Sequence, residues 1–389
     1  MVSPVVLTTG TDRQLIPFNR PTASGREADY IAQALSAGHL SGDGAFTRHC
    51  SKLLEQETGA AKALLTTSCT HALEMAALLL DLRPGDEVIV PSFTFVSTLN
   101  AFVLRGARPR CVDIRADTLN IDETLIEREI NERTRAIFLV HYAGVGCGMD
   151  VIMKIARARG LAVVEDNAHG LFGSYQGRPL GSFGDFATLS FHETKNITCG
   201  EGGAILINNP AYVDRAEIIR EKGTDRSRFF RGQVDKYTWV DVGSSYLPSE
   251  LNAAFLWGQL EVRHEIQRRR SAIWQEYGSR LQEWAEPRGV RLPYVPPDCE
   301  HPAHMFYLLM PSLEARQAFI AQLRKANVMA TFHYLPLHLS PMGLRYGYAP
   351  GDLPIVERVS DQLVRLPLFS GMQPRDVDRV IEAVCAWAP

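Results

Sequence analysis

Ser-Phe-His-Glu-Thr-Lys-Asn-Ile-Thr-Cys-Gly-Glu-Gly-Gly, residues 190–203, places one lysine, Lys195, on a short connection between two apolar runs. Residues 186–191 precede the lysine and residues 203–207 follow it, and both runs have the composition of buried strands. Most lysines are solvated surface charges. Short connections at strand ends are, however, where α/β proteins often place their chemistry, so the surroundings of Lys195 decide its role.

Strand-like and helix-like segments alternate through the chain before this stretch. Apolar runs predict strands at residues 63–67, 87–91, 110–114, 136–142 and 161–165. Helical spacing is found at residues 27–37, 46–57, 71–80, 98–105, 124–131 and 149–159. The alternation predicts an α/β fold with a mostly parallel sheet that is covered by helices on both faces.

The alternation breaks after residue 207. A polar, aromatic-rich loop is expected at 222–241, and a long helical stretch at 249–281. The pattern then restarts with predicted strands at 305–310 and 328–332 and predicted helices at 313–326, 353–363 and 374–386. We therefore expect a large domain at residues 1–262 and a smaller C-terminal α/β domain at residues 263–389.

Composition limits the classes of protein that fit. The chain has 389 residues, is 46% hydrophobic and 22% charged, and has a formal charge of -3, which does not suggest a nucleic-acid partner. Its seven cysteines are scattered, with no Cys-x-x-Cys pair, so we predict no metal site and no disulfide framework. With no signal-like start and no apolar run of about 18 residues, the expectation is a soluble cytoplasmic protein that binds no membrane.

Two motifs resemble other classes of site but lack a required residue. Residues 144–148, Gly-Val-Gly-Cys-Gly, bring the third glycine one position too early for a dinucleotide-binding turn. Residues 192–196 begin like a zinc-protease helix but end in Asn196, where a second histidine ligand is needed. A dehydrogenase and a zinc hydrolase are therefore both disfavoured.

Asp166 ends an apolar run, Leu-Ala-Val-Val-Glu-Asp, at the predicted carboxyl end of a parallel strand. Such a carboxylate either caps a helix or points into the crevice where open α/β sheets bind ligands. Its combination with Lys195 favours the second interpretation, because pyridoxal phosphate needs both groups. The lysine forms a Schiff base with the cofactor, and the carboxylate keeps the pyridine nitrogen protonated.

Other residues can complete such a site. Cys69 and Thr70 begin a predicted helix, whose free amides and dipole favour a phosphate, and Ser190 can add a hydroxyl, although a simple helix cap is commoner. Phe95 can stack on the cofactor ring, although most aromatic residues beside strands are core residues. His169 is structural unless the ring lies beside it.

Four segments, in this order, resemble the DegT/DnrJ/EryC1/StrS family of sugar aminotransferases. They are Leu-Thr-Thr-Ser-Cys-Thr at 65–70, Pro-Ser-Phe-Thr-Phe-Val-Ser-Thr at 91–98, Val-Glu-Asp-Asn-Ala-His at 164–169 and Ser-Phe-His-Glu-Thr-Lys-Asn at 190–196. The resemblance runs over nearly the whole chain from Ile16. Residues 220–239 are similar to family members that form dTDP-4-amino-4,6-dideoxygalactose.

The resemblance implies a fold type I enzyme that uses pyridoxal phosphate, in its aldehyde and amine forms, with L-glutamate as amino donor. It also implies a homodimer whose active sites lie between subunits. Lys195 would be the Schiff-base lysine and proton shuttle, and Asp166 the partner of the pyridine nitrogen. The remaining implied site residues are Phe95 and His169 beside the ring, Cys69, Thr70 and Ser190 at the phosphate, His192 near the lysine, and His333 and Tyr334 near the sugar.

One segment departs from the family pattern. Where family members commonly have Asn-Tyr/Phe-Arg-Met before the long helix, this chain has Ser-Tyr-Leu-Pro at 245–248. Ser245 is then the residue expected to reach the phosphate in the partner subunit. The implied substrate is dTDP-4-keto-6-deoxy-D-glucose. Alternatives are another nucleotide-linked 3- or 4-ketosugar and a non-catalytic regulator that binds the cofactor; a sugar dehydratase is disfavoured because that group has histidine at the position of Lys195.

Overall fold

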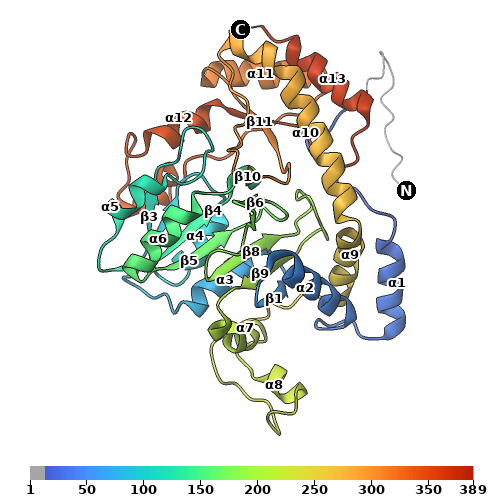
Figure 1. The fold of residues 1–389 in the computed structure, drawn as a ribbon, viewed down its shortest axis with the longest axis vertical. Helices are drawn as coiled ribbons and strands as arrows, with labels where there is room; N and C mark the ends of the chain where they lie inside the picture. The colour runs from blue at the N-terminus through green and yellow to red at the C-terminus, as the bar shows by residue number, and fades with distance from the viewer. Residues whose placement is uncertain (1–13, 389) are drawn as a thin grey trace, which may run out of the picture.

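The structure is a computed structural model that describes residues 14–388, and a seven-stranded sheet lies at its centre (Figure 1). The strands follow the order β1-β9-β8-β5-β4-β2-β3. β9 is antiparallel to both of its neighbours, and every other neighbouring pair in the sheet is parallel. The predicted α/β fold with a mostly parallel sheet is therefore confirmed. The strands are β1 (Lys62–Thr66), β2 (Glu87–Pro91), β3 (Arg108–Val112), β4 (Thr134–Val140), β5 (Ala162–Asp166), β8 (Phe186–Ser190) and β9 (Gly203–Ile207).

Helices cover both faces of this sheet because successive strand side chains point to opposite sides. Val164 and Ile205 pack in the same cluster as side chains of α3, α4 and α7. Val163 packs with α6, and Leu206 packs with α2 and α9. The helices around the sheet are α1 (Glu27–Ala37), α2 (Ala45–Thr58), α3 (Cys69–Leu79), α4 (Val96–Val103), α5 (Ile126–Glu129), α6 (Met149–Arg159), α7 (Val213–Arg220), α8 (Arg226–Phe230) and α9 (Glu250–Glu261).

A second core lies in the C-terminal part of the chain, and α10 (Arg263–Ala285) leads to it along one side of the molecule (Figure 1). Ile16 packs into this core, and its backbone pairs with Val328. Val262 lies at the junction of α9 and α10, and the division there into two domains stays a prediction. The other elements are β11 (Phe306–Leu309), α11 (Leu313–Lys325), α12 (Pro354–Gln362), β12 (Leu363–Leu366) and α13 (Pro374–Cys385).

The prediction of a strand at residues 328–332 is wrong. Only single bridges form there, from Val328 to Ile16 and from Thr331 to Arg365. The strand that pairs with β11 is instead β12, which begins where the helix predicted at 353–363 ends. Within the loop expected at 222–241, α8 forms a short helix whose Arg228 pairs with Asp214.

Three strands of two residues each were not predicted. β6 (Ser174–Tyr175), β7 (Arg178–Pro179) and β10 (Cys299–Glu300) make a small separate sheet.

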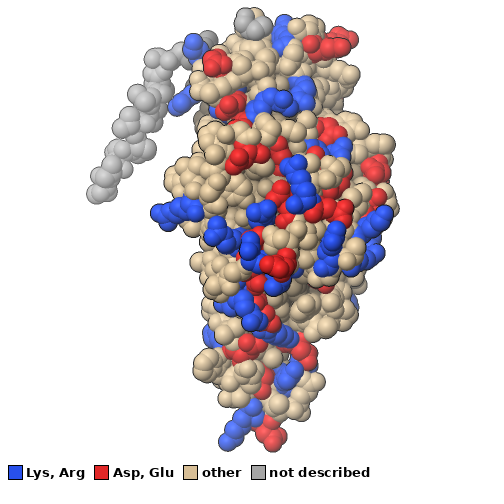
Figure 2. All heavy atoms as spheres, turned by 90° about the vertical axis from the view of Figure 1, so that its left-hand side faces the viewer, with Lys and Arg blue, Asp and Glu red and all other residues tan. Residues whose placement is uncertain are grey.

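Acidic and basic side chains are interspersed over the face of the molecule that Figure 2 shows. Within residues 14–388, no helix has both the length and the apolar character that a membrane crossing requires.

Glu250 joins two elements that are distant in the sequence. It is the first residue of α9 and is buried, and its carboxylate accepts hydrogen bonds from the amides of Gly44 at 3.0 Å, Phe46 at 2.9 Å and Thr47 at 3.1 Å. These amides begin α2, whose N-cap glycine offers no side chain to accept them. Glu250 therefore caps α2 and holds it against α9.

Glu250→Ala should lower the free energy of unfolding by about 3 kcal/mol, because it leaves several buried amides without an acceptor. Denaturant unfolding followed by circular dichroism measures this loss. Glu265→Ala on the exposed face of α10 is the control and should change stability little. Equal stability of the Glu250 and Glu265 variants would contradict the proposed role of Glu250.

Candidate active site

A cavity of about 480 Å³ brings together every predicted site residue except Ser245. It lies where β5 and β8 end and where α3 and α4 begin, with one wall contributed by the C-terminal part of the chain. The predicted residues that line it are Lys195, His192, Cys69, Thr70, Phe95, Asp166, His169, Ser190, His333 and Tyr334.

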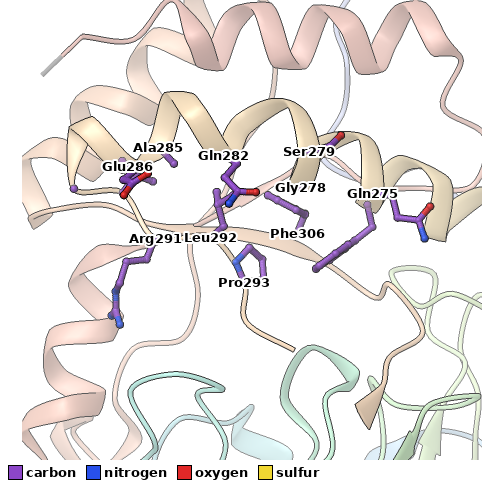
Figure 3. Close-up of a pocket in the computed structure, with 13 residues that line it drawn as sticks. Gln275, Gly278, Ser279, Gln282, Ala285, Glu286, Arg291, Leu292, Pro293 and Phe306 are labelled. Carbon is purple, nitrogen blue, oxygen red and sulfur yellow. The ribbon is translucent and has the colours of Figure 1, made fainter. Parts of the chain in front are cut away.

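A larger hollow of about 890 Å³ lies elsewhere, between α10 and the chain that leads to β11 (Figure 3). Gln275, Ser279 and Gln282 line it from the helix, and Arg291 and the following residues line its other side. None of the predicted site residues lines it. Volume alone therefore does not locate the chemistry in this protein.

Lys195 lies on the connection from β8 to β9, which is closed by the hydrogen bonds of its own backbone. The amide of Lys195 donates to the carbonyl of His192 at 2.9 Å, and the amide of Glu193 donates to that of Gly200 at 2.8 Å. Among residues 14–388, no group forms a hydrogen bond or ion pair with its Nζ atom. Burial lowers the pKa of Lys195 to about 8, although Cys69 and Asp166 act in the opposite direction.

Asp166 is the last residue of β5 and is buried. One carboxylate oxygen accepts a hydrogen bond from the Thr98 hydroxyl at 2.7 Å, and the other accepts one from the amide of Ala168 at 3.2 Å. Burial raises the pKa of Asp166, while these hydrogen bonds and the charge of Lys195 lower it. A turn and not an α-helix follows β5, so helix capping does not explain this carboxylate.

The N-terminus of α3 forms another wall. Ser68 caps the helix by accepting from the amide of His71 at 3.1 Å, and Cys69 and Thr70 occupy the first turn. The Thr70 hydroxyl lies 2.7 Å from that of Ser97. First-turn amides have no acceptor inside the helix, so this wall suits a phosphate.

Gly203 fixes the position of this helix terminus. A Cβ atom on Gly203 would lie 2.4 Å from the amide nitrogen of Cys69, so only glycine allows β9 to approach α3 this closely. Gly203 pairs with Ser190 at the end of β8. The hydroxyl of Ser190 and the start of α3 therefore lie on the same side of the cavity.

Phe95 and His169 contribute rings to the cavity. Phe95 is 56% exposed, so its alternative interpretation as a core residue is wrong. His169 is buried and stacks on His304, with ring centroids 4.3 Å apart. Burial, followed by the charge of Lys195, holds the pKa of His169 well below its usual value, and its Nδ1 atom has no partner among residues 14–388.

The remaining predicted residues, His192, His333 and Tyr334, also line the cavity. His192 Nδ1 lies 2.8 Å from the Thr194 hydroxyl, and Nε2 lies 3.6 Å from Glu201. Tyr334 stacks on His333, with ring centroids 4.1 Å apart. Both aromatic residues come from the segment that was predicted to approach the sugar.

Ser245 does not reach the cavity of its own chain. It is exposed, and its backbone forms a bridge with Glu221. A contact with the phosphate in a partner subunit stays a prediction.

The structure also brings into the cavity three residues from segments that the sequence did not connect with the site. Phe18 comes from the N-terminal segment, His304 from the chain before β11, and Arg365 from β12. Of these three, only Arg365 has a sequence feature that could have indicated a site residue: it is a charged residue inside the apolar run Leu-Val-Arg-Leu at 363–366.

The residues of the cavity fit pyridoxal phosphate. Lys195 provides an unpartnered amine, and Asp166 provides a buried carboxylate. The start of α3, with Ser97 and Ser190, provides amides and hydroxyls for a phosphate. The unpartnered Nδ1 atom of His169 is a further polar atom that a ligand can satisfy.

Comparison with known proteins supports the same conclusion. A model of the DegT/DnrJ/EryC1/StrS aminotransferase family matches residues 21–385. The chain belongs to this family. Aminotransferases of the family depend on pyridoxal phosphate, which is the predicted cofactor. A relative with 32% identity over 377 residues, 95% of this chain and 96% of the relative, is the spore coat polysaccharide biosynthesis protein SpsC of Bacillus subtilis strain 168.

Solved structures of other aminotransferases confirm the fold type I architecture of this DegT/DnrJ/EryC1/StrS family member. Aminotransferase TlmJ from Streptoalloteichus hindustanus is 28% identical, with a TM-score of 0.88 over 96% of this chain and 98% of that chain. Spr1654 from Streptococcus pneumoniae has the same identity and TM-score over 95% of this chain and 98% of its own, and is known in PLP and PMP forms. The chain is thus, by family, a sugar aminotransferase.

The reaction of cofactor-free protein with pyridoxal phosphate should depend on pH through Lys195. Only the neutral amine attacks an aldehyde, and the neutral fraction grows as pH rises through the pKa. Burial lowers the pKa of Lys195 to about 8. The rate of cofactor attachment should therefore increase with pH and reach half its maximum near that pH. Stopped-flow absorbance measures this rate. A midpoint above pH 10 would show a solvated amine.

Gly203→Ala should weaken the binding of pyridoxal phosphate by roughly 10-fold or more, because the new methyl group displaces the start of α3 by its contact with Cys69. Equilibrium dialysis of the cofactor measures the loss. Gly278→Ala in α10, where a Cβ would meet only ordinary contacts at 3.8 Å and 4.0 Å, is the control for a glycine substitution. Unchanged affinity of the Gly203 variant would contradict the phosphate site at α3.

Proposed function

We propose that this enzyme transfers the amino group of L-glutamate to C4 of dTDP-4-keto-6-deoxy-D-glucose, which gives dTDP-4-amino-4,6-dideoxy-D-galactose. One observation carries the aminotransferase chemistry: an unpaired lysine whose pKa is lowered to about 8 lines the same cavity as a buried aspartate and a helix N-terminus. The sugar is proposed from residues 220–239, which resemble enzymes that form this product.

Residues of the cavity have separate roles toward the cofactor. Lys195 would hold it covalently, Asp166 would pair with its ring nitrogen, and Cys69, Thr70 and Ser190 would bind its phosphate. Phe95 and His169 would lie beside its ring. When bound, pyridoxal phosphate supplies an electron sink that stabilises negative charge at the reacting carbon.

Lys195 is also the proposed proton carrier. Its Nζ atom accepts the proton that leaves Cα of glutamate, and in the second half of the reaction it donates a proton to C4 of the sugar. A pKa of about 8 suits this exchange, because both the neutral and the charged form are available near neutral pH. His192 belongs to the same connection between β8 and β9, lines the cavity and would assist near the lysine.

The buried histidines of the cavity add no charge to it. Burial holds the pKa values of His169 and His304 well below the usual value, so both rings are neutral. Tyr334 and Phe95, whose ring centroids lie 6.2 Å apart, add aromatic surface. Tyr334, which stacks on His333, would lie toward the part of the cavity that receives the sugar.

We also propose a cytoplasmic homodimer with shared active sites. The segment that contains α8 projects from the body of the chain (Figure 1), and its aromatic residues are exposed: Phe230 by 70%, Tyr237 by 53% and Trp239 by 76%. A partner subunit would cover such a surface. Ser245, which follows this segment, would then reach the partner's phosphate site. The SpsC relative supports a role in the biosynthesis of a cell-surface polysaccharide.

Product analysis decides the substrate. The purified protein is incubated with pyridoxal phosphate, L-glutamate and a panel of dTDP- and UDP-linked 3-keto and 4-keto sugars, and the products are identified by NMR. The proposal expects the 4-amino galacto product from the dTDP-linked 4-ketosugar. Amination of another ketosugar alone would replace the proposed substrate. No change in cofactor absorbance on addition of glutamate would favour a regulator that only binds the cofactor.

Lys195→Ala should retain a cofactor supplied in its amine form, because the other contacts remain, but it should lose the proton carrier. We expect transamination to fall by at least about 1,000-fold. Absorbance reports the bound cofactor, and the rate of aminosugar formation reports turnover. Lys325→Ala, which removes an exposed lysine at the end of α11, should keep full activity. Substantial residual turnover of the Lys195 variant would overturn the assignment.

A further inference from the structure

Arg365 is the one arginine among the described residues that line the cavity. It is mostly enclosed, and no carboxylate of residues 14–388 lies within 4 Å of its guanidinium group. NH1 lies 3.1 Å from Nδ1 of His333, and the ring of Phe18 lies 4.7 Å from the central carbon of the guanidinium. The Nε atom is buried without a hydrogen-bond partner.

Two other buried arginines show how this chain normally compensates such a charge. Arg220 forms a two-point ion pair with Asp43, at 2.6 and 2.7 Å. Arg270 donates to the carbonyls of Ala303 at 3.2 Å and His304 at 2.6 Å. Within the part of the chain that the structure describes, the Arg365 side chain has neither an acid nor a carbonyl as partner. An enclosed guanidinium does not lose its proton, so a ligand has to supply acceptors for its N–H groups, and an anion also compensates the charge.

We propose that Arg365 binds the α-carboxylate of the amino donor. This inference rests on the proposed function, since it concerns the donor of that same reaction. The planar guanidinium presents paired donors that match a carboxylate. Arg365 and Lys195 line the same cavity of about 480 Å³. The anion that Arg365 binds therefore lies in the cavity where the lysine meets the reacting carbon.

Of the anionic groups of the two substrates, the α-carboxylate fits this position. It is bonded directly to Cα, from which Lys195 removes the proton. The diphosphate of a sugar nucleotide is separated from C4 by the sugar ring, so it lies further from the lysine. Arg365 should thus act on the donor half of the reaction and not on the ketosugar half.

The geometry also assigns a positioning role to His333. Because arginine can only donate, Nδ1 of His333 must be the acceptor, and the ring proton is on Nε2. Nε2 then donates to the hydroxyl of Tyr142 at 2.7 Å. The contact with Tyr142 fixes the imidazole ring, and the other ring nitrogen accepts from Arg365. The ring of Phe18 packs against the guanidinium. His333 then acts on the donor through Arg365, and Tyr334 remains as the residue toward the sugar.

Titration of the pyridoxal-phosphate enzyme with L-glutamate, followed by cofactor absorbance, tests Arg365 directly. Arg365→Gln should weaken glutamate binding roughly 10- to 100-fold, the range for a lost charged hydrogen-bonded contact, and Arg365→Lys should lie between it and wild type. Binding of 4-aminobutyrate, which lacks the α-carboxylate, should change by less than about twofold. Arg345→Gln, at an exposed arginine in the same part of the chain, is the control and should leave both unchanged.

The second half of the reaction separates the donor from the sugar nucleotide. The enzyme is loaded with the amine form of the cofactor and mixed with dTDP-4-keto-6-deoxy-D-glucose, and the rate of one turnover is measured. Arg365→Gln should keep the wild-type rate. A lower rate with unchanged glutamate binding would overturn the proposal, because Arg365 would then bind the sugar nucleotide. Equal losses for glutamate and 4-aminobutyrate would also overturn it.

His333 variants test the positioning role. His333→Phe should weaken glutamate binding, and His333→Gln should restore it, because an amide can accept from Arg365 and donate to Tyr142. Losses confined to the ketosugar half-reaction would return His333 to a direct sugar contact.

Failure of the proposed function would be distinguishable. If wild-type enzyme aminated none of the ketosugars, the proposed function would fail. The glutamate and 4-aminobutyrate titrations need no ketosugar, so they would still support or overturn the role of Arg365.

Discussion

The enclosure of Lys195, which has no ion-pair partner among residues 14–388, is the constraint on which the site depends. Burial removes water from an ammonium group and favours its neutral form, and here it lowers the pKa to about 8. Asp166 acts in the opposite direction but does not cancel the effect of burial. The β8–β9 connection is closed by its own backbone hydrogen bonds. The amine of Lys195 is therefore not needed to hold the connection together and stays free.

The order of the strands explains why these groups meet. β5 and β8 are parallel neighbours, so Asp166 and the connection that carries Lys195 leave the same edge of the sheet. β9 runs antiparallel beside β8, and its first residue, Gly203, lies against the start of α3. One sheet edge therefore presents an amine, a carboxylate and a helix N-terminus to the same cavity.

Residues within these motifs could be predicted because each motif is local. A lysine between two strands, or Asp166 at a strand end, has a recognisable pattern, and the parallel sheet then brings the patterns together. Arg365 and His304 could not be predicted in the same way, since their positions follow from how the C-terminal core packs against the sheet. The strand wrongly expected at 328–332 has the same cause: its apolar pattern fits a strand, but β12 pairs with β11 instead.

The charges of the cavity follow from burial as well as from sequence. Burial keeps the rings of His169, His304 and His333 neutral, so these three residues provide surface and hydrogen bonds without charge. Among the described residues that line the cavity, two enclosed cations, Lys195 and Arg365, share it with one buried acid, Asp166. Because Arg365 keeps its proton at any physiological pH, Lys195 is the cation whose charge changes near neutrality. The cavity thus combines a fixed positive charge, suited to holding an anion, with an adjustable one, suited to moving a proton.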